Sequence, residues 1–224
     1  MTAPSTGDTV AQALAKPLLR GWIHTVMAPL AAVIGIVLLV LAPTPGARAA
    51  VAVFAVTTVV LFTTSAIYHR GTWSPRRFAT LRRLDHSNIF LVIAGTDTPL
   101  AVMLLPVRTA TVLLAVVWGG ALAGIGARVF WLNAPRWFYV PVYVALGWVA
   151  VWFMPAFWSA SNAAVVWLII AGGLGYTLGA LAYGFKRPNP SPRYFGYHEI
   201  FHVGTVVGYT CHAVAVGAAV LLAR

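Results

Sequence analysis

Acidic residues are nearly missing from this sequence. Of its 224 residues only 4 are Asp or Glu and 8% carry a charge, whereas 60% are hydrophobic. A soluble domain has about 25% charged residues, so this composition excludes a water-soluble globular fold. Cysteine is also scarce. Cys211 stands alone, which excludes an intramolecular disulfide and a cysteine-based zinc framework.

Long apolar runs fill most of the chain. A transmembrane α-helix takes about 20 residues, and seven runs reach that length. The first run is too long for a signal-peptide core, so we count it as a helix. We therefore predict an all-α integral membrane protein: a tail over residues 1–21, then a single seven-helix transmembrane bundle over residues 22–224. The predicted spans are 22–42, 47–69, 84–105, 110–129, 137–157, 163–185 and 197–223.

Basic residues divide unevenly between the two sides of this bundle. The tail and the connections on its side carry 12 of the 15 Lys and Arg residues, and the opposite side carries Arg48, Arg108 and Arg224. Because Lys and Arg collect in cytoplasmic loops, the N-terminus is predicted to be cytoplasmic and the C-terminus outside, in a multi-pass protein of the cell (plasma) membrane. The net charge of +11 is then explained without a nucleic-acid partner.

Several ionisable residues lie in or next to the spans, where each needs a reason because burial in lipid is costly. The predicted topology brings His69, Asp85 and His198 to the cytoplasmic end of the bundle. His198 and His202 are i,i+4 on one helix, a spacing that suits two nitrogen ligands of one metal. His69 could supply a third, and three His with an open fourth position are typical of catalytic zinc. Ser65, one turn deeper than His69, and Asp85 could then hold a water on the metal.

Two other interpretations of these residues remain open. A histidine at a membrane interface is commonly just an interfacial polar residue. The run His198-Glu199-Ile200-Phe201-His202 also matches H-E-x-x-H, which in zincins supplies two ligands and a Glu general base. The acids available as a third ligand, Asp85 and Asp97, lack the context of that class. Otherwise Glu199 is a carboxylate in a first helical turn, where the helix dipole favours it.

The motifs together resemble the hemolysin III family, the bacterial branch of the progestin and adipoQ receptor proteins. They are Ser65-Ala66-Ile67-Tyr68-His69, Leu84-Asp85-His86-Ser87-Asn88-Ile89-Phe90, Gly95-Thr96-Asp97-Thr98-Pro99, His198-Glu199-Ile200-Phe201-His202 and Cys211-His212. The resemblance in order and spacing covers nearly the whole chain. It implies a zinc ion held by His69, His198 and His202, with Asp85 and Ser65 contacting a zinc-bound water.

Asp97 departs from that family pattern, in which an aromatic residue precedes Thr-Pro. At 1.5 Å per residue, Asp97 lies about 18 Å deeper than Asp85, and His212 about 21 Å deeper than His198. We therefore expect a hydrogen bond between Asp97 and His212. The alternative is that Asp97 caps a backbone break before Pro99 and faces a water pocket.

The leading functional hypothesis is a zinc-dependent hydrolase of a lipid amide or ester. A zinc ion makes hydroxide available near neutral pH, Asp85 would act as general base, and Ser65 would hold the water or the oxyanion. Its partner would be a membrane lipid, as substrate or ligand. The alternatives are a receptor-like or regulatory protein with a structural zinc, a cytolytic pore former, and an ion or proton carrier that uses Asp97 and His212.

Overall fold

The computed structural model describes residues 16–131 and 134–223, and within them the regular structure is helical. Seven helical segments of this part of the chain are long and apolar enough to cross a membrane, which confirms the predicted all-α, seven-span fold. The helices are α2 (Trp22–Leu41), α3 (Pro45–Arg70), α4 (Pro75–Leu104), α5 (Val107–Phe130), α6 (Arg136–Gly147), the 3₁₀ helix η1 (Val149–Phe153), α7 (Met154–Ala160), α8 (Ala163–Phe185) and α9 (Tyr197–Leu222).

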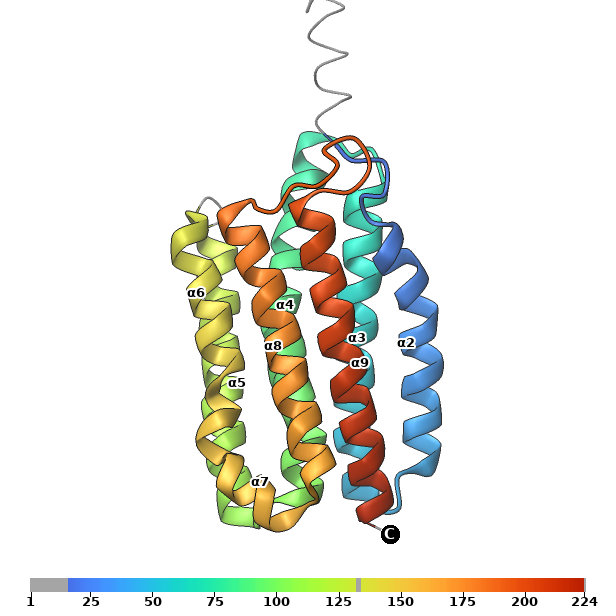
Figure 1. The fold of residues 1–224 in the computed structure, drawn as a ribbon, viewed down its shortest axis with the longest axis vertical. Helices are drawn as coiled ribbons and strands as arrows, with labels where there is room; N and C mark the ends of the chain where they lie inside the picture. The colour runs from blue at the N-terminus through green and yellow to red at the C-terminus, as the bar shows by residue number, and fades with distance from the viewer. Residues whose placement is uncertain (1–15, 132–133, 224) are drawn as a thin grey trace, which may run out of the picture.

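The spans form one bundle of helices that run up and down alternately (Figure 1). Helices α8 and α9 pack side by side, and α3 and α4 pack together in the same way. Helix α4 is the most enclosed of the spans. In its most apolar 18-residue stretch 72% of the residues are buried, against 22% in the corresponding stretch of α2. The core therefore surrounds α4, and the residues on this helix are the ones best shielded from lipid.

Local capping explains where several helices begin. Thr44 accepts a hydrogen bond from the Ala47 amide at 3.1 Å, and Pro45 fills the first helical position of α3. Asn162 accepts from the Val165 amide at 3.0 Å at the start of α8. These caps fall in the turns that separate the apolar runs, so hydropathy and capping agree at these boundaries.

The third span begins earlier than predicted, at Pro75 instead of residue 84. Its first turns carry exposed arginines, among them Arg76 and Arg77, which the apolar pattern assigned to a loop. A helix continues into water as long as its backbone hydrogen bonds are satisfied, so hydropathy marks the lipid boundary and not the helix end. At the other end the helix runs through Pro99 without a break, and Asp97 therefore does not cap one.

The fifth span is not a single helix. It divides into α6, η1 and α7, and together these segments still make a continuous apolar crossing over Arg136–Ala160. Pro155 lies in the first turn of α7, where its missing N–H costs nothing. The Trp148 indole donates to Thr177 Oγ1 at 2.8 Å and ties the junction to α8.

Glycines allow α8 and α9 to approach closely. A Cβ at Gly175 would lie 3.2 Å from the Gly208 amide nitrogen, and one at Gly204 would lie 2.7 Å from the Gly175 carbonyl oxygen. Small residues at such an interface let two backbones pack in lipid, where no hydrophobic force draws them together. By contrast, Gly119 of α5 and Gly173 of α8 have no heavy atom within 4 Å of an added Cβ.

Candidate metal centre

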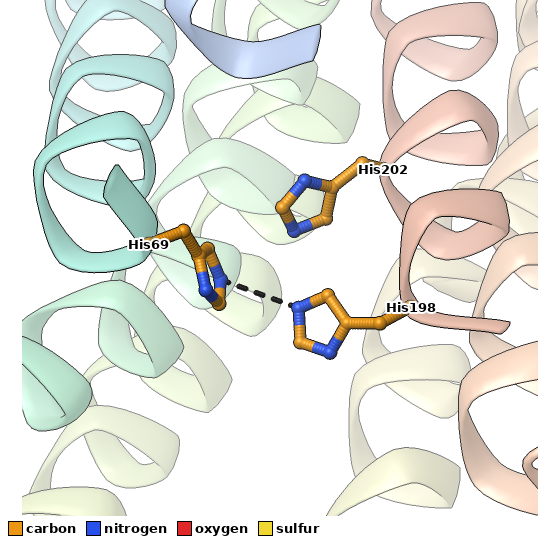
Figure 2. A group of neighbouring side chains, drawn as sticks. All are labelled: His69, His198 and His202. Atoms are coloured by element: carbon orange, nitrogen blue, oxygen red, sulfur yellow. Dashed lines mark hydrogen bonds between the residues drawn. The ribbon is translucent and has the colours of Figure 1, made fainter. Parts of the chain in front are cut away.

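Three histidines from two helices meet at one end of the bundle. Here α3 ends and α9 begins, and we refer to it as the histidine end. His69 lies in the last turn of α3, and His198 and His202 lie in the first two turns of α9. Figure 2 shows the three rings pointing toward one another across the space between the helices. The sequence reasoning had brought these same three residues together.

The donor set fits a metal ion. One nitrogen of each ring lies within 4.8 Å of the others, and His69 Nε2 and His198 Nε2 are 3.2 Å apart. Two nitrogens bound tetrahedrally to zinc at 2.0–2.1 Å are separated by about 3.3 Å, so this pair already has the spacing of two ligands. His69 and His202 are 6% and 2% exposed, which excludes most competing water. The three residues could therefore hold a metal ion.

Asp85 and Ser65 lie beside this cluster, as predicted. An Asp85 carboxylate oxygen is 3.8 Å from His69 Nε2, and Ser65 lines the same cavity as Asp85. Ser65 comes from α3 one turn before His69, and the half-buried Asp85 comes from α4 directly before its buried stretch. A carboxylate and a hydroxyl thus stand next to the candidate ligands without being part of the three-histidine group.

Glu199 has a structural task and is not free to serve as a zincin-type base. One of its carboxylate oxygens pairs with Arg20, and the other accepts a hydrogen bond from the Gly196 amide at 2.8 Å. The side chain is fully buried. Both oxygens are committed to the N-terminal tail and to the start of α9, so the H-E-x-x-H match reflects helix capping. This agrees with the alternative of a first-turn carboxylate favoured by the helix dipole.

The tail residues that lead into α2 cover the histidine end. The Leu18 amide donates to the Arg193 carbonyl at 2.9 Å, which ties the tail to the connection before α9. Gly21 has a φ of 83°, and a Cβ there would lie 2.8 Å from the Cβ of His69. The tail therefore packs directly on the candidate ligands.

His24 belongs to the site, although sequence reasoning passed over it. Its ring stacks on that of His202 with centroids 3.9 Å apart and planes at 6°. Phe62 packs edge-on against His24, and His24 is only 2% exposed. Its position in the sequence could have indicated this role, because His24 lies in the first turn of the first span, which the alternating topology places at the histidine end. It contributes by holding the His202 ring.

His86 lies near the site but outside the three-histidine group. Its Nδ1 is 2.7 Å from the Arg82 carbonyl oxygen, and its ring packs edge-on against Tyr139. The backbone carbonyl of His86 accepts a hydrogen bond from Tyr143 at 3.2 Å. His86 therefore ties α4 to α6.

The expected hydrogen bond between Asp97 and His212 does not form. His212 Nε2 instead lies 3.1 Å from the backbone carbonyl oxygen of Ile169 in α8. The two residues are at the same depth and line the same cavity, as the rise per residue predicted. The pairing failed because depth does not specify the rotation of a helix about its axis, and α9 turns His212 toward α8.

A cavity connects the candidate metal centre with the bundle interior. Ser65, Asp85 and His202 line one end, and Asp97 and His212 line the other. The wall between them is mainly apolar and includes Leu61, Ile89, Val92, Ile93 and Phe201. The side of His202 therefore faces a space suited to a hydrocarbon chain.

Comparison with known proteins identifies the family. A family model described as haemolysin-III related matches residues 12–213. The hemolysin-3 homolog of Bacillus subtilis (strain 168) is 29% identical over 135 residues, or 60% of this chain, and hemolysin-3 of Bacillus cereus is 28% identical over 144 residues, or 64% of this chain. The matched segments span 63% and 65% of those two relatives. With its seven apolar helices, this chain is a multi-pass membrane protein that belongs to the haemolysin-III related family.

Proposed function

We propose that this protein is a zinc-dependent hydrolase that cleaves an amide or ester bond of a membrane lipid and contributes to membrane-lipid homeostasis. The observation that carries the proposal is the neighbourhood of the three histidines. His202 faces a mainly apolar cavity, and Asp85 and Ser65 line the same end of that cavity. A ligand set, a proton acceptor and a lipid-compatible space therefore meet at one place.

In this proposal His69, His198 and His202 hold the ion. A bound zinc ion supplies a Lewis acid that lowers the pKa of water to about 7 and polarises a carbonyl group. The Asp85 carboxylate accepts a proton from the attacking water and returns it to the leaving amine or alcohol, so that one C–N or C–O bond breaks and a free fatty acid forms. The Ser65 hydroxyl, which lines the same cavity, would hold the attacking water or the developing oxyanion.

Burial supports this chemistry. His69 and His202 are almost fully enclosed, and in a low-dielectric site a proton acceptor and a polarising charge act more strongly than in water. The apolar wall formed by Leu61, Ile89 and Val92 would receive the acyl chain of the substrate. Binding of the chain would then position the scissile carbonyl at the histidine end.

The test is metal analysis together with fatty-acid release from ceramide-like amides and matched esters by the purified protein. We expect about one zinc per chain. His202→Ala should lose both zinc and activity. Asp85→Asn should keep zinc and lose activity by about 100-fold or more, because general acid–base catalysis contributes about that factor.

Glu199→Gln is the matched control for the zincin interpretation. It should keep zinc and turnover but lower stability, since the amide oxygen can still accept from Gly196 while the ion pair with Arg20 is lost. Full occupancy by zinc with no release of fatty acid from any substrate would contradict the hydrolase and favour a regulatory protein with a structural metal. Dye leakage from liposomes would instead favour the lytic activity suggested by the name of the Bacillus cereus relative.

A further inference from the structure

The cavity that begins at the candidate metal centre follows one face of α4 inward. Its lining residues on that helix are Asp85, Ile89, Val92, Ile93, Thr96 and Asp97. Twelve residues separate the two aspartates, which at 1.5 Å per residue is about 18 Å. The α4 wall of the cavity is therefore long, with one acidic residue at each end and mainly apolar side chains between.

Polar atoms gather at the far end without partners. Thr96 Oγ1, the Tyr176 hydroxyl and His212 Nδ1 are buried, and none has a hydrogen-bond partner among the described residues. All three residues line the cavity together with Asp97. Thr96 and Asp97 are 3% and 7% exposed. A buried polar atom without a hydrogen-bond partner is costly, so three such atoms at one place indicate a missing partner.

The chemistry of these atoms specifies that partner. His212 Nε2 faces the Ile169 carbonyl oxygen, which can only accept, so the ring hydrogen is on Nε2 and Nδ1 is an acceptor. The Asp97 carboxyl oxygens can also accept, and the hydroxyls of Thr96 and Tyr176 can accept or donate. The site therefore offers several acceptors to a group that donates hydrogen bonds.

Two glycines fix the orientation of the rings at this end. A Cβ at Gly172 would collide with the His212 ring, and a Cβ at Gly208 would lie 2.6 Å from the Tyr176 ring. Each ring is thus seated on a glycine of the neighbouring helix, and their centroids are 5.6 Å apart. Each helix of the α8–α9 interface thus provides a glycine for a ring of the other helix, and this packing holds both rings at the cavity wall.

We propose that Thr96, Asp97, Tyr176 and His212 form a second binding site, which receives a hydroxyl or ammonium group at the far end of an elongated lipid. The inference deepens the proposed function, on which it rests for the idea that a lipid occupies the cavity. The ligand then has two polar ends: a carbonyl at the histidine end and a hydrogen-bond donor about 18 Å away. The apolar wall between them contacts its chain.

The experiment compares the binding of palmitate, ω-hydroxypalmitate and ω-aminopalmitate to the full-length protein in lipid nanodiscs, by competition with a fluorescent fatty acid. We expect at least one of the two ω-substituted acids to bind about tenfold or more tightly than palmitate, because its donor satisfies buried acceptors. A preference for the hydroxyl or for the amine identifies the donor. Equal binding of all three acids overturns the proposal.

Variants locate the preference. We expect Asp97→Leu to bind palmitate and the two ω-substituted acids with equal affinity. Should this variant fail to fold, Thr96→Val combined with Tyr176→Phe takes its place, with the same expectation. Tyr209→Phe is the matched control, since its buried hydroxyl also lacks a partner among the described residues but does not line the cavity. Retention of the preference in the Asp97 variant, or its loss in Tyr209→Phe, overturns the assignment. Free acids have no bond to hydrolyse, so this result is independent of whether the protein is a hydrolase.

Discussion

The stacking of His24 on His202 is the most specific single contact at the candidate metal centre. Neither nitrogen of His24 has a hydrogen-bond partner among the described residues, so the ring acts by contact. It contacts both His202 and Phe62, with centroid distances of 3.9 and 5.0 Å. A ligand ring held in this way has little freedom to turn away from a metal.

The effect of substituting His24 on zinc affinity should therefore depend on whether the new side chain keeps an aromatic ring. His24→Phe keeps an aromatic ring against His202, and we expect an affinity within about threefold of the original protein. His24→Ala removes the support and should weaken binding by about 10- to 100-fold, the usual effect of losing a group that orients a ligand. Competition with a chelator of known affinity measures both. An equal loss in the two variants would mean that His24 binds the metal through a nitrogen.

At the level of the elements, the contact between α8 and α9 positions two of the three candidate ligands. His198 and His202 lie on the first turns of α9, and the glycines that follow bring this helix against α8. A Cβ at Gly204 would lie 2.7 Å from the Gly175 carbonyl oxygen and 2.8 Å from the Gly179 Cα. Both obstacles are backbone atoms, which cannot rotate out of the way.

Gly204→Ala should consequently destabilise the protein by about 1–3 kcal/mol, the usual cost of overpacking. Gly119→Ala is the control in α5, where an added Cβ meets no heavy atom within 4 Å, and it should be neutral or up to about 1 kcal/mol more stable. Thermal or denaturant unfolding in detergent compares the two. Equal stabilities of the Gly204→Ala and Gly119→Ala variants would show that α8 and α9 can move apart without a loss of stability.

For the whole molecule, the central prediction concerns orientation. The histidine end carries the start of α4 with its arginines, and the positive-inside rule predicts that this end faces the cytoplasm. Lipid-facing sides such as those of Val33, Ile36 and Val40 on α2 are 59%, 62% and 72% exposed, as expected of a chain surrounded by lipid. The candidate metal centre would then lie just below the inner leaflet headgroups.

Cysteine labelling tests this orientation in a Cys211→Ala background. Arg108→Cys lies at the end of the bundle opposite the histidines, and an impermeant maleimide added to intact cells should label it. Arg76→Cys, at the histidine end, should react only after the cells are permeabilised. Both positions are exposed, so accessibility within the protein is matched. Labelling of Arg76→Cys in intact cells would reverse the predicted topology.

Much of this molecule follows from the sequence alone, because the properties concerned are local. Apolar runs set the seven spans, turn residues separate them, and alternating direction brings His69 and Asp85 to one end. The i,i+4 spacing of His198 and His202 places two imidazoles on one face of a helix whatever surrounds it. Asp97 and His212 likewise line one cavity, in keeping with the similar depths calculated from the rise per residue.

Only the tertiary structure decided how each helix is rotated. Spans that are apolar on nearly every side carry little information about which face turns inward. The partners of side chains therefore emerged from packing: His24 stacks on His202, Arg20 pairs with Glu199, and His212 bonds to α8 instead of Asp97. Sequence specifies which residues reach a given depth, and close packing between helices specifies which of them touch.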